Sequence, residues 1–464
     1  LFRSTDVKRL HKFYESGIPV PSLEMAGPRE TIFHDPAWTR AGIVTCGGLC
    51  PGLNNVIKGL VQVLWFDYGV RNIFGIPYGY RGLNPAYGYP PIVLDPDVVD
   101  AIQEDGGTIL GSSRGNQDAK VMVDTLMRLN INVLFCIGGD GTLRGAHDIA
   151  QEVQKRKQPI SVIGIPKTID NDLNLIDRTF GFETAVLSAT DVITSAHNEA
   201  NGAFNGLGLV KLMGRDSGFI AAYAALATTV VNICLVPEVP FTLDGLFRAL
   251  ESRYSSGKTH AVIAVAEGAG QELFNDQEER RDASGNLLKN DIGEFLTRKI
   301  KEHFDKVGKE VNIKYFDPSY MVRSIPAKGT DAIFCFQLAE AAVHAGMAGK
   351  TDMVVGSMNF RDLFANKRIF VVLLFRMVVC SGLAVLFAVC SGIAGAIPSG
   401  KAIVMIPLLS ALAPSASNIN QVAILYNKDA PYASAINILT TLSCILTIPL
   451  WMMLYECLVP GPVF

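Results

Sequence analysis

The chain has 464 residues, 18% of them charged, with a formal net charge of −3 at pH 7. This length allows about three domains of roughly 150 residues. The hydrophobic content of 49% argues against a disordered chain, and the charge balance argues against a nucleic-acid-binding protein. The nine cysteines form no C-x-x-C pair and the histidines show no metal-ligand spacing, so we expect buried, reduced thiols.

Residues 1–40 are polar and rich in proline, which predicts an N-terminal lead-in. Because the chain begins with Leu1, we expect a further segment, such as a targeting sequence, to precede it. Short β-branched runs then alternate with segments of helical period. The predicted strands are 41–45, 72–76, 133–137, 160–165, 207–212, 232–236, 261–266 and 312–316. The predicted helices include 53–66, 143–155, 188–199, 219–227, 243–254 and 292–305.

This alternation predicts mostly parallel sheets with helices on both faces. We expect an α/β fold of two Rossmann-like parallel-sheet domains with a cleft between them. The first predicted sheet domain is 41–185 and the second is 186–358. Ligands of such sheets bind at the carboxyl ends of the strands, so the loops there should carry the function.

The frequency of charged residues falls abruptly after residue 368. This change predicts an all-α, membrane-like tail of about three helices at 369–464. These 96 residues carry five charges, at Arg376, Lys401, Lys428, Asp429 and Glu456. The uncharged runs 377–397 and 432–454 are each long enough to cross a bilayer. The apolar stretch between them is broken by proline and polar residues, as in helices that line a carrier site. Buried helices of a soluble fold are the alternative.

The first two loops suit phosphate binding. The run TCGGLCPGLN contains Gly47 and Gly48, where the backbone can approach a phosphate, and a helix N-terminus follows. A tight turn without a ligand is the alternative. The loop 107–118 places Arg114 among small residues, where its guanidinium could hold a phosphate through two hydrogen bonds.

The next two loops combine glycines with carboxylates. The strand at 133–137 leads into GGDGT, in which Asp140 could hold Mg²⁺. Several kinase families that act on lipids, NAD or sugars share this short signature. The strand at 160–165 leads into PKTIDND, where Asp170 and Asp172 suit general-base chemistry on a hydroxyl and Lys167 offers a charge for phosphate.

Seven sequence motifs occur in the order found in 6-phosphofructokinases, and their residues resemble those of the plant and protist branch. They are GGLCPGLN, GGTILGSSRGNQD, GGDGT, GIPKTIDND, KLMGRDSGFIA, AEGAG and YMVR. The resemblance covers roughly residues 1–358. It implies that 41–185 is the nucleotide-binding domain and 186–358 the sugar-phosphate-binding domain, with a truncated C-terminal end. It implies a glycolytic kinase that moves the γ-phosphate of ATP to the 1-hydroxyl of fructose 6-phosphate. It further implies Mg²⁺ as cofactor, a homo-oligomer, a cytoplasmic location and no nucleic-acid partner.

The resemblance also implies site residues. Asp170 would be the base and Asp140 the metal ligand. The other catalytic residues would be Arg114, Thr168 and Asp172. The nucleotide site would comprise Gly47, Gly48, Arg114, Gly139, Asp140, Gly141 and Thr142. The sugar site would comprise Thr168, Asp170, Asp172, Met213, Gly214, Arg215, Glu267, Lys314, Tyr320 and Arg323. Lys314 would reach the sugar phosphate of a neighbouring subunit, although Gly206 replaces a second basic residue that many members have.

The glycine at position 141 indicates which phosphoryl donor the family resemblance implies. Pyrophosphate-using members carry Asp where this chain has Gly141, and a carboxylate there would collide with the α-phosphate of a nucleotide. Gly141 therefore favours ATP. Lys167 also occurs in the pyrophosphate enzymes, so pyrophosphate stays open as an alternative donor.

The tail resembles the C-terminal end of the auxin efflux carrier family, over about the last 95 residues. Two incomplete families would then be joined, by a gene fusion or by a mis-joined gene model. A real fusion would be a kinase tethered to a membrane. Two other functions stay open. One is a membrane carrier component with a non-catalytic kinase-like domain. The other is a lipid or NAD kinase, although the motifs PKTIDND and MGR argue against it.

Overall fold

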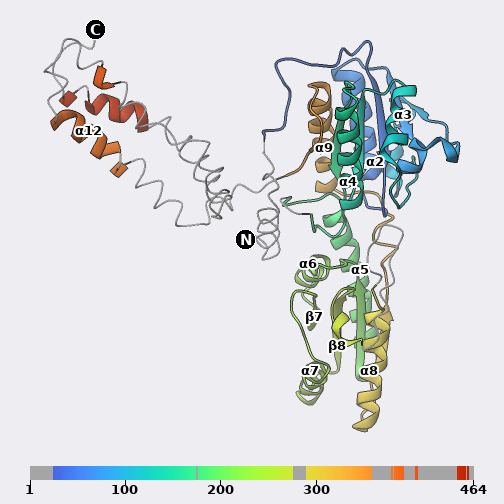
Figure 1. The fold of residues 1–464 in the computed structure, drawn as a ribbon. Coiled ribbons are helices and arrows are strands. Elements are labelled where there is room, and N and C mark those ends of the chain that lie inside the picture. The colour runs from blue at the N-terminus through green and yellow to red at the C-terminus, as the bar shows by residue number, and fades with distance from the viewer. Residues whose placement is uncertain are drawn as a thin grey trace. The chain divides into compact units, whose positions relative to one another are not determined.

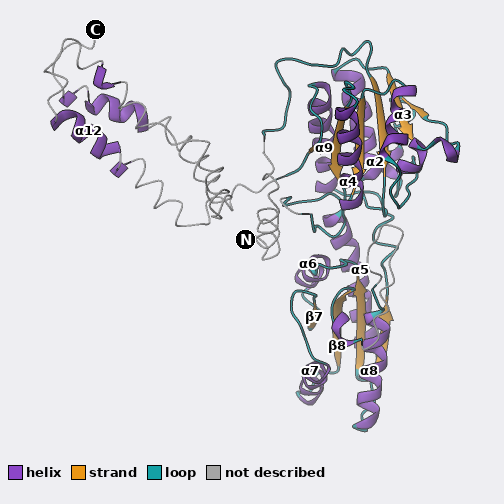
Figure 2. Cartoon of the chain, viewed as in Figure 1, coloured by secondary structure: helices purple, strands orange, loops and turns teal. Residues whose placement is uncertain are grey.

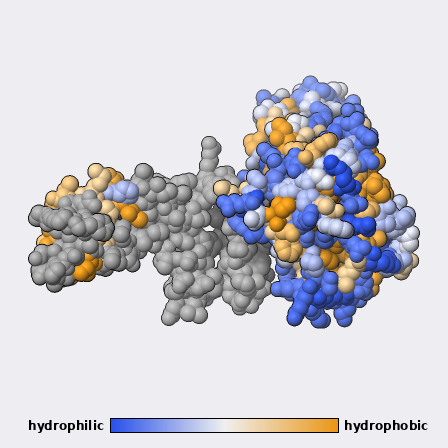
Figure 3. Space-filling view, turned by 90° about the horizontal axis from the view of Figure 1, so that it is seen from above, coloured by the Kyte–Doolittle hydropathy of each residue, from blue (hydrophilic) through white to orange (hydrophobic). Residues whose placement is uncertain are grey.

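A computed structural model of the chain describes residues 24–173, 176–274 and 289–357, with short pieces at 378–379, 381–390, 403–405, 447–455 and 457–458. The chain divides into two units, one formed by residues 24–358 and the other by residues 1–23 with 359–464. On the surface of the larger unit hydrophilic and hydrophobic residues are interspersed (Figure 3).

The first sheet of the larger unit has six strands in the order β10-β5-β4-β1-β2-β3. Neighbouring strands are parallel except for β3, which runs antiparallel to β2. The strands are β1 (Arg40–Thr45), β2 (Asn72–Ile76), β3 (Ile92–Leu94), β4 (Val133–Gly138), β5 (Ser161–Pro166) and β10 (Met353–Val354).

Alternating apolar residues explain why helices cover both faces of this sheet (Figure 1). In β4, Val133, Phe135 and Ile137 belong to the cluster that includes α2 (Leu53–Gln62) and α9 (Thr330–Met347). Leu134 and Cys136 face the other way, into the cluster that includes α3 (Ala119–Arg128) and α4 (Asp140–Lys155). The strand is thus buried on both faces, as in other parallel sheets.

The second sheet has four parallel strands in the order β7-β8-β6-β9 (Figure 2). They are β6 (Gly206–Leu212), β7 (Ile233–Leu235), β8 (His260–Ala266) and β9 (Asn312–Phe316). One face packs against α5 (Phe182–Asn201) and α6 (Phe219–Thr228), and the other against α7 (Leu243–Ser255) and α8 (Ile292–Lys306). Short helical turns lie at Val63–Asp67, Gly79–Leu83, Pro85–Tyr87, Ile102–Glu104 and Gln271–Leu273.

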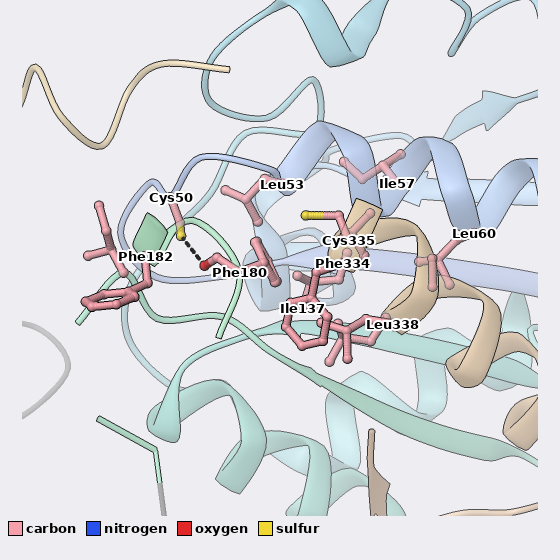
Figure 4. Packing of buried hydrophobic residues seen from close by; sticks show 14 of the residues in the cluster. Cys50, Leu53, Ile57, Leu60, Ile137, Phe180, Phe182, Phe334, Cys335 and Leu338 are labelled. Carbon is pink, nitrogen blue, oxygen red and sulfur yellow. Dashed lines mark hydrogen bonds between the residues drawn. The ribbon is translucent and has the colours of Figure 1, made fainter. Parts of the chain in front are cut away.

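One hydrophobic cluster runs from the first sheet to the second. Around Phe180 and Phe182 it joins the side chains of α2 and α9 to α5, which packs on the second sheet (Figure 4). The Cys50 thiol donates a hydrogen bond to the carbonyl oxygen of Phe180, at 3.2 Å, within this cluster. Burial raises the pKa of Cys50 to about 12. Among the described cysteines, Cys46, Cys50, Cys136 and Cys335 are buried as predicted, whereas Cys234, Cys390 and Cys457 are exposed, contrary to the prediction.

The predicted α/β fold with two mostly parallel sheets is confirmed, but two boundaries differ. The predicted second domain, 186–358, contains α9 and β10, whereas α9 packs on α2 and β10 pairs with β5 of the first sheet. The predicted division at 185–186 also falls inside α5. In the predicted lead-in, buried His34 bonds Ser161 through its Nε2 atom at 2.9 Å, so its end is part of the first sheet's packing.

The predicted membrane-spanning runs, 377–397 and 432–454, lie mostly outside the described residues. Their described parts include α12 (Ser381–Cys390) and residues 447–454. Across the described parts of the chain, no helix has the length and apolar character that a membrane crossing requires.

Candidate active site

The glycine- and aspartate-rich loops follow strands that end side by side. Thr45 of β1 lies opposite Ile137 of β4, and Gly138 lies opposite Pro166 at the end of β5. The Lys167 amide continues this pairing by donating to the Gly138 carbonyl oxygen at 2.9 Å. The loops predicted to carry Gly47, Asp140 and Asp170 therefore leave the sheet at one edge, as expected for parallel strands.

Three cationic side chains gather at Gly47 and Gly48. Lys167 is buried, and its Nζ donates to the Gly48 carbonyl oxygen at 2.7 Å. A methyl group added at Gly48 would lie 3.6 Å from an Arg323 nitrogen and 3.8 Å from an Arg114 nitrogen. Burial lowers the pKa of Lys167, and the carboxylate of Asp170 opposes that shift. Such a cluster suits an anion of high charge, such as a phosphate chain.

This cluster differs from the predicted grouping in one respect. The family resemblance implies that Arg114 binds the nucleotide and Arg323 the sugar phosphate. The structure brings both guanidinium groups to the same glycine, together with Lys167. Nothing local in YMVR indicates that its arginine meets a loop more than 270 residues earlier in the chain.

The GGDGT loop forms the start of α4. Gly139 precedes the helix, Asp140 is exposed in its first turn and Thr142 is buried. A methyl group added at Gly141 would meet no atom within 4 Å, so the space beside Asp140 is open. The Tyr80 hydroxyl donates to the Thr142 carbonyl oxygen at 2.6 Å and holds this turn, a contact that the sequence analysis missed.

Asp140 alone offers a magnesium ligand at this turn. The described residues contain no group of three or more His, Cys, Asp or Glu side chains arranged to hold a metal. Mg²⁺ usually keeps several waters and is bound by one or two carboxylates plus the phosphates of a substrate. One exposed carboxylate at a helix start with open space beside it fits that mode of binding.

A hydrogen-bond network shapes the loop that carries Asp170. The Thr168 hydroxyl donates to Asp172 Oδ1 at 2.9 Å and accepts from the Asp170 amide at 3.1 Å. Asn171 adopts a positive φ of 52°, and its Oδ1 accepts from the Thr179 amide at 2.9 Å. The predicted residues Thr168, Asp170 and Asp172 thus form one turn, which Asn171 helps to hold.

Asp170 has the properties of a proton acceptor. Its Oδ1 atom is buried and has no hydrogen-bond partner among the described residues. Burial, followed by the charges of Asp172 and Glu267, raises the pKa of Asp170 to about 8, while Lys167 and Arg215 oppose the rise. A general base works best when its pKa lies near the operating pH.

The second sheet reaches Asp170 through the loop after β6. The Ser217 hydroxyl lies 3.1 Å from the Asp170 carbonyl oxygen, to which it donates. Arg215 has a positive φ of 48°, and its amide donates to Glu267 Oε1 at 2.9 Å. Burial raises the pKa of Glu267. Met213 and Gly214 lie in the same loop, so the structure brings the MGR and AEGAG blocks together at Asp170.

The remaining predicted sugar-site residues come from β9 and the loop after it. The Arg323 guanidinium lies over the ring of Tyr320, 4.6 Å from its centroid, and Tyr320 is exposed. Lys314 differs from the others, because it pairs with Gly208 inside β9 rather than following the strand's carboxyl end.

Comparisons with known proteins agree with this geometry. A family model described as Phosphofructokinase matches residues 40–346. A protein of Borreliella burgdorferi named ATP-dependent 6-phosphofructokinase is 52% identical over 341 residues, which cover 72% of this chain and 76% of that protein. A protein of the same name from Entamoeba histolytica is 50% identical, over 72% of this chain and 76% of that protein.

Plant relatives and solved structures match the same region. ATP-dependent 6-phosphofructokinase 7 of Arabidopsis thaliana is 48% identical, over 73% of this chain and 70% of that protein. The crystal structure of a pyrophosphate-dependent phosphofructokinase from Marinobacter aquaeolei has a TM-score of 0.55 at 22% identity, over 68% of this chain and 77% of that one. That likeness shows a shared fold. With the family match and the close relatives, it establishes that the chain belongs to the phosphofructokinase family.

Proposed function

We propose that this protein transfers the γ-phosphate of ATP to the 1-hydroxyl of fructose 6-phosphate. The observation that carries the proposal is the Asp170 carboxylate, buried, with a raised pKa, between the cationic glycine loop and the loop after β6. In the transfer, the sugar oxygen forms a bond to the γ-phosphorus as the bond to the β-phosphate oxygen breaks. Asp170 accepts the proton of the sugar hydroxyl.

The charge of the donor would be balanced by the cluster at Gly47 and Gly48. Arg114 and Lys167, which lie at these glycines, would bind its phosphates, and Asp140 would hold the magnesium ion. Bound Mg²⁺ supplies further neutralisation of charge on the phosphates. Thr168 and Asp172 keep the Asp170 turn in shape. Catalysis of this type depends mostly on positioning and electrostatic stabilisation.

The sugar phosphate would bind to the loops of the second sheet. Arg215, with its loop neighbours Met213 and Gly214, lies beside Asp170 together with Glu267. Tyr320 and Arg323 would complete this site, and Lys314 would act across a subunit boundary of a homo-oligomer. Sedimentation of the purified protein tests the oligomer, because a monomer in the presence of substrate would leave Lys314 without that role.

The open space at Gly141 supports ATP as the donor, since nothing there obstructs a nucleotide. Pyrophosphate is the alternative, and it would leave that space unused. Activity with pyrophosphate and none with ATP would overturn the assignment.

Asp170→Asn tests the proposal directly. The amide cannot accept the sugar proton, so we expect turnover to fall by about 10²–10⁴-fold. Nucleotide binding should be retained, because the phosphate-binding cations are unchanged. Turnover is measured as ADP release that depends on fructose 6-phosphate. Near-normal turnover in this variant would reject the role of Asp170. A wild-type chain without such ADP release would favour a non-catalytic kinase-like domain.

Membrane attachment through the tail is a separate hypothesis. Residues 369–464 carry five charged residues and resemble part of the auxin efflux carrier family, and we propose that they tether an otherwise cytoplasmic kinase to a membrane. Alkaline carbonate extraction of membranes from cells that express the full chain tests this. Recovery of the chain in the extracted supernatant would contradict tethering and leave the kinase proposal intact.

A further inference from the structure

A lysine of β6 bridges two acidic residues beside the candidate sugar site. Lys211 lies one residue past Val210, which pairs with Phe316 at the end of the register between β6 and β9. The Lys211 Nζ atom lies 2.7 Å from Asp291 Oδ2 and 2.8 Å from Asp317 Oδ2, and its side chain is only 11% exposed. These ion pairs continue the contact between β6 and the chain after β9 beyond the last backbone pair of the two strands.

The two carboxylates belong to different segments of the chain. Asp291 caps the start of α8, because its Oδ1 atom accepts from the Glu294 amide at 3.0 Å. Asp317 follows β9 and starts the next loop, where its Oδ1 atom accepts from the Ser319 amide at 3.1 Å. Lys211 therefore ties β6 both to the start of α8 and to the start of the loop after β9.

The loop that Asp317 starts carries two residues of the candidate sugar site, Tyr320 and Arg323. The Pro318 carbonyl oxygen accepts from the Val322 amide at 3.1 Å, and the Val322 side chain is buried. This short turn joins the start of the loop to both sugar-site residues. A shift of Asp317 would therefore move Tyr320 and Arg323 with it.

Without the lysine charge, two carboxylates would face each other. Asp291 Oδ2 and Asp317 Oδ2 both contact one nitrogen atom, so they lie close together and would repel. Burial alone would lower the pKa of Lys211, but its hydrogen bonds to Asp291 and Asp317 raise that pKa above its ordinary value, so Lys211 stays charged. Asp291 is held at the start of α8, and the loop of Asp317 is therefore the segment that we expect to move.

We propose that Lys211 is a positioning residue for the sugar phosphate, holding the loop of Tyr320 and Arg323 against β6 through Asp317. The inference rests on the proposed function, because that proposal assigns this loop to fructose 6-phosphate. Strand β6 continues into the loop 213–218, which is also proposed to bind the sugar phosphate. The ion pair between Lys211 and Asp317 thus keeps two sugar-binding loops in register.

Lys211→Met tests the proposal, because it keeps the length of the side chain and removes its charge. We expect the KM for fructose 6-phosphate to rise about 10-fold with kcat within about threefold of the wild type, since the loop binds the sugar phosphate equally before and during transfer. The KM for ATP should stay within about threefold, because Lys167 is held at Gly48 by its own hydrogen bond. Lys211→Arg keeps the charge and should restore the KM for fructose 6-phosphate to within about threefold of the wild type.

Two asparagine variants separate the two carboxylates. Asp317→Asn keeps an oxygen for the Ser319 amide and leaves the Lys211 charge near Glu267, so its effect reports on the loop. It should raise the KM for fructose 6-phosphate as much as Lys211→Met. Asp291→Asn keeps a helix cap and the pair between Lys211 and Asp317, so this KM should stay within about twofold. Lys211→Met combined with Asp317→Asn should show no further rise, because both changes remove one contact.

Lys299→Met is the matched control, because Lys299 pairs with Glu302 at 3.0 Å on the surface of α8 and should leave both KM values unchanged. If Lys211→Met does not fold, Asp317→Asn decides, since the Asp317 side chain is 38% exposed. An unchanged KM for fructose 6-phosphate in either folded variant would overturn the inference alone. Equal rises in both KM values, or additive rises in the double variant, would do the same. A wild-type chain without ADP release that depends on fructose 6-phosphate would overturn the proposed function and this inference together.

Discussion

The space beside Asp140 depends on the residue that follows it. A side chain at Gly141 would meet no protein atom within 4 Å, and the position lies in the first turn of α4. An acidic residue in the first turn of a helix is favourable by about 0.3–1 kcal/mol. Replacing this glycine should therefore leave the fold intact while changing what fits the site.

We expect Gly141→Asp to raise the KM for ATP at least about 10-fold, because its carboxylate would face a phosphate of the same charge. The melting temperature should not fall. Initial rates and thermal unfolding measure the two quantities. Gly141→Ala is the control, since it adds a methyl group without charge and should keep most of the affinity. An unchanged KM for ATP in Gly141→Asp would contradict the donor argument.

Asp170 should also destabilise the folded protein at neutral and alkaline pH. Its folded pKa of about 8 exceeds its ordinary value of 3.8. Between these values the unfolded chain has lost the proton and the folded chain keeps it, so stability falls as pH rises. Below about pH 4 and above about pH 8 this contribution is constant.

Asp170→Asn removes that penalty, because the amide does not titrate. Its gain in free energy of unfolding over the wild type should therefore be larger at pH 8 than at pH 5. Urea unfolding of both proteins at the two values measures the difference. A gain independent of pH would show that the carboxyl group is not held protonated in the folded state.

Hydrogen bonds join the first turns of α5 and α9, two helices that pack on different sheets. Asp331 of α9 and Thr184 of α5 are fully buried. Asp331 Oδ2 accepts from the Thr184 amide at 2.7 Å and from its hydroxyl at 2.8 Å. The Arg178 guanidinium lies 3.7 Å from the other carboxylate oxygen. This contact joins α9, which packs on the first sheet, to α5, which packs on the second.

Asp331→Ala should reduce the free energy of unfolding by about 1–3 kcal/mol, because it leaves buried donors of Thr184 without an acceptor. The urea midpoint measures the loss. Asp244→Ala, at an exposed position in the first turn of α7, is the control and should change stability by less than about 0.5 kcal/mol. Equal losses in free energy of unfolding for the two variants would contradict the stabilising role of the contact between Asp331 and Thr184.

The strands and helices of this fold differ in how well their local sequence patterns predict them. All eight strands that the alternation predicts are present, because each is a short apolar run bounded by loops. Helix α9 and strand β10 are absent from the predicted elements. Helix α9 exposes the apolar residues Ile333 and Phe336 as well as burying apolar residues, so its sequence shows no clear helical stripe. Strand β10 has two residues, too few for any period.

Within the unit 24–358 both sheets supply residues of the candidate site, so the ligands of that site should stabilise this unit. A ligand at 100 times its dissociation constant adds about 2.7 kcal/mol to the free energy of unfolding. We expect ATP with Mg²⁺ and fructose 6-phosphate each to raise the melting temperature by a few degrees. Asp170→Asn should keep the ATP shift. Loss of that shift in the variant would place Asp170 in nucleotide binding instead.

Sequence patterns alone indicate the alternating α/β architecture, the family and the loops of the candidate site, because each depends on a short pattern or on the order of motifs along the chain. Tertiary structure alone placed Arg323 beside Arg114 and Gly48, added β10 to the first sheet and buried the Asp170 carboxylate. These features join residues that are distant in sequence. Their pairing depends on how whole helices and sheets pack, for which a local pattern carries no signal.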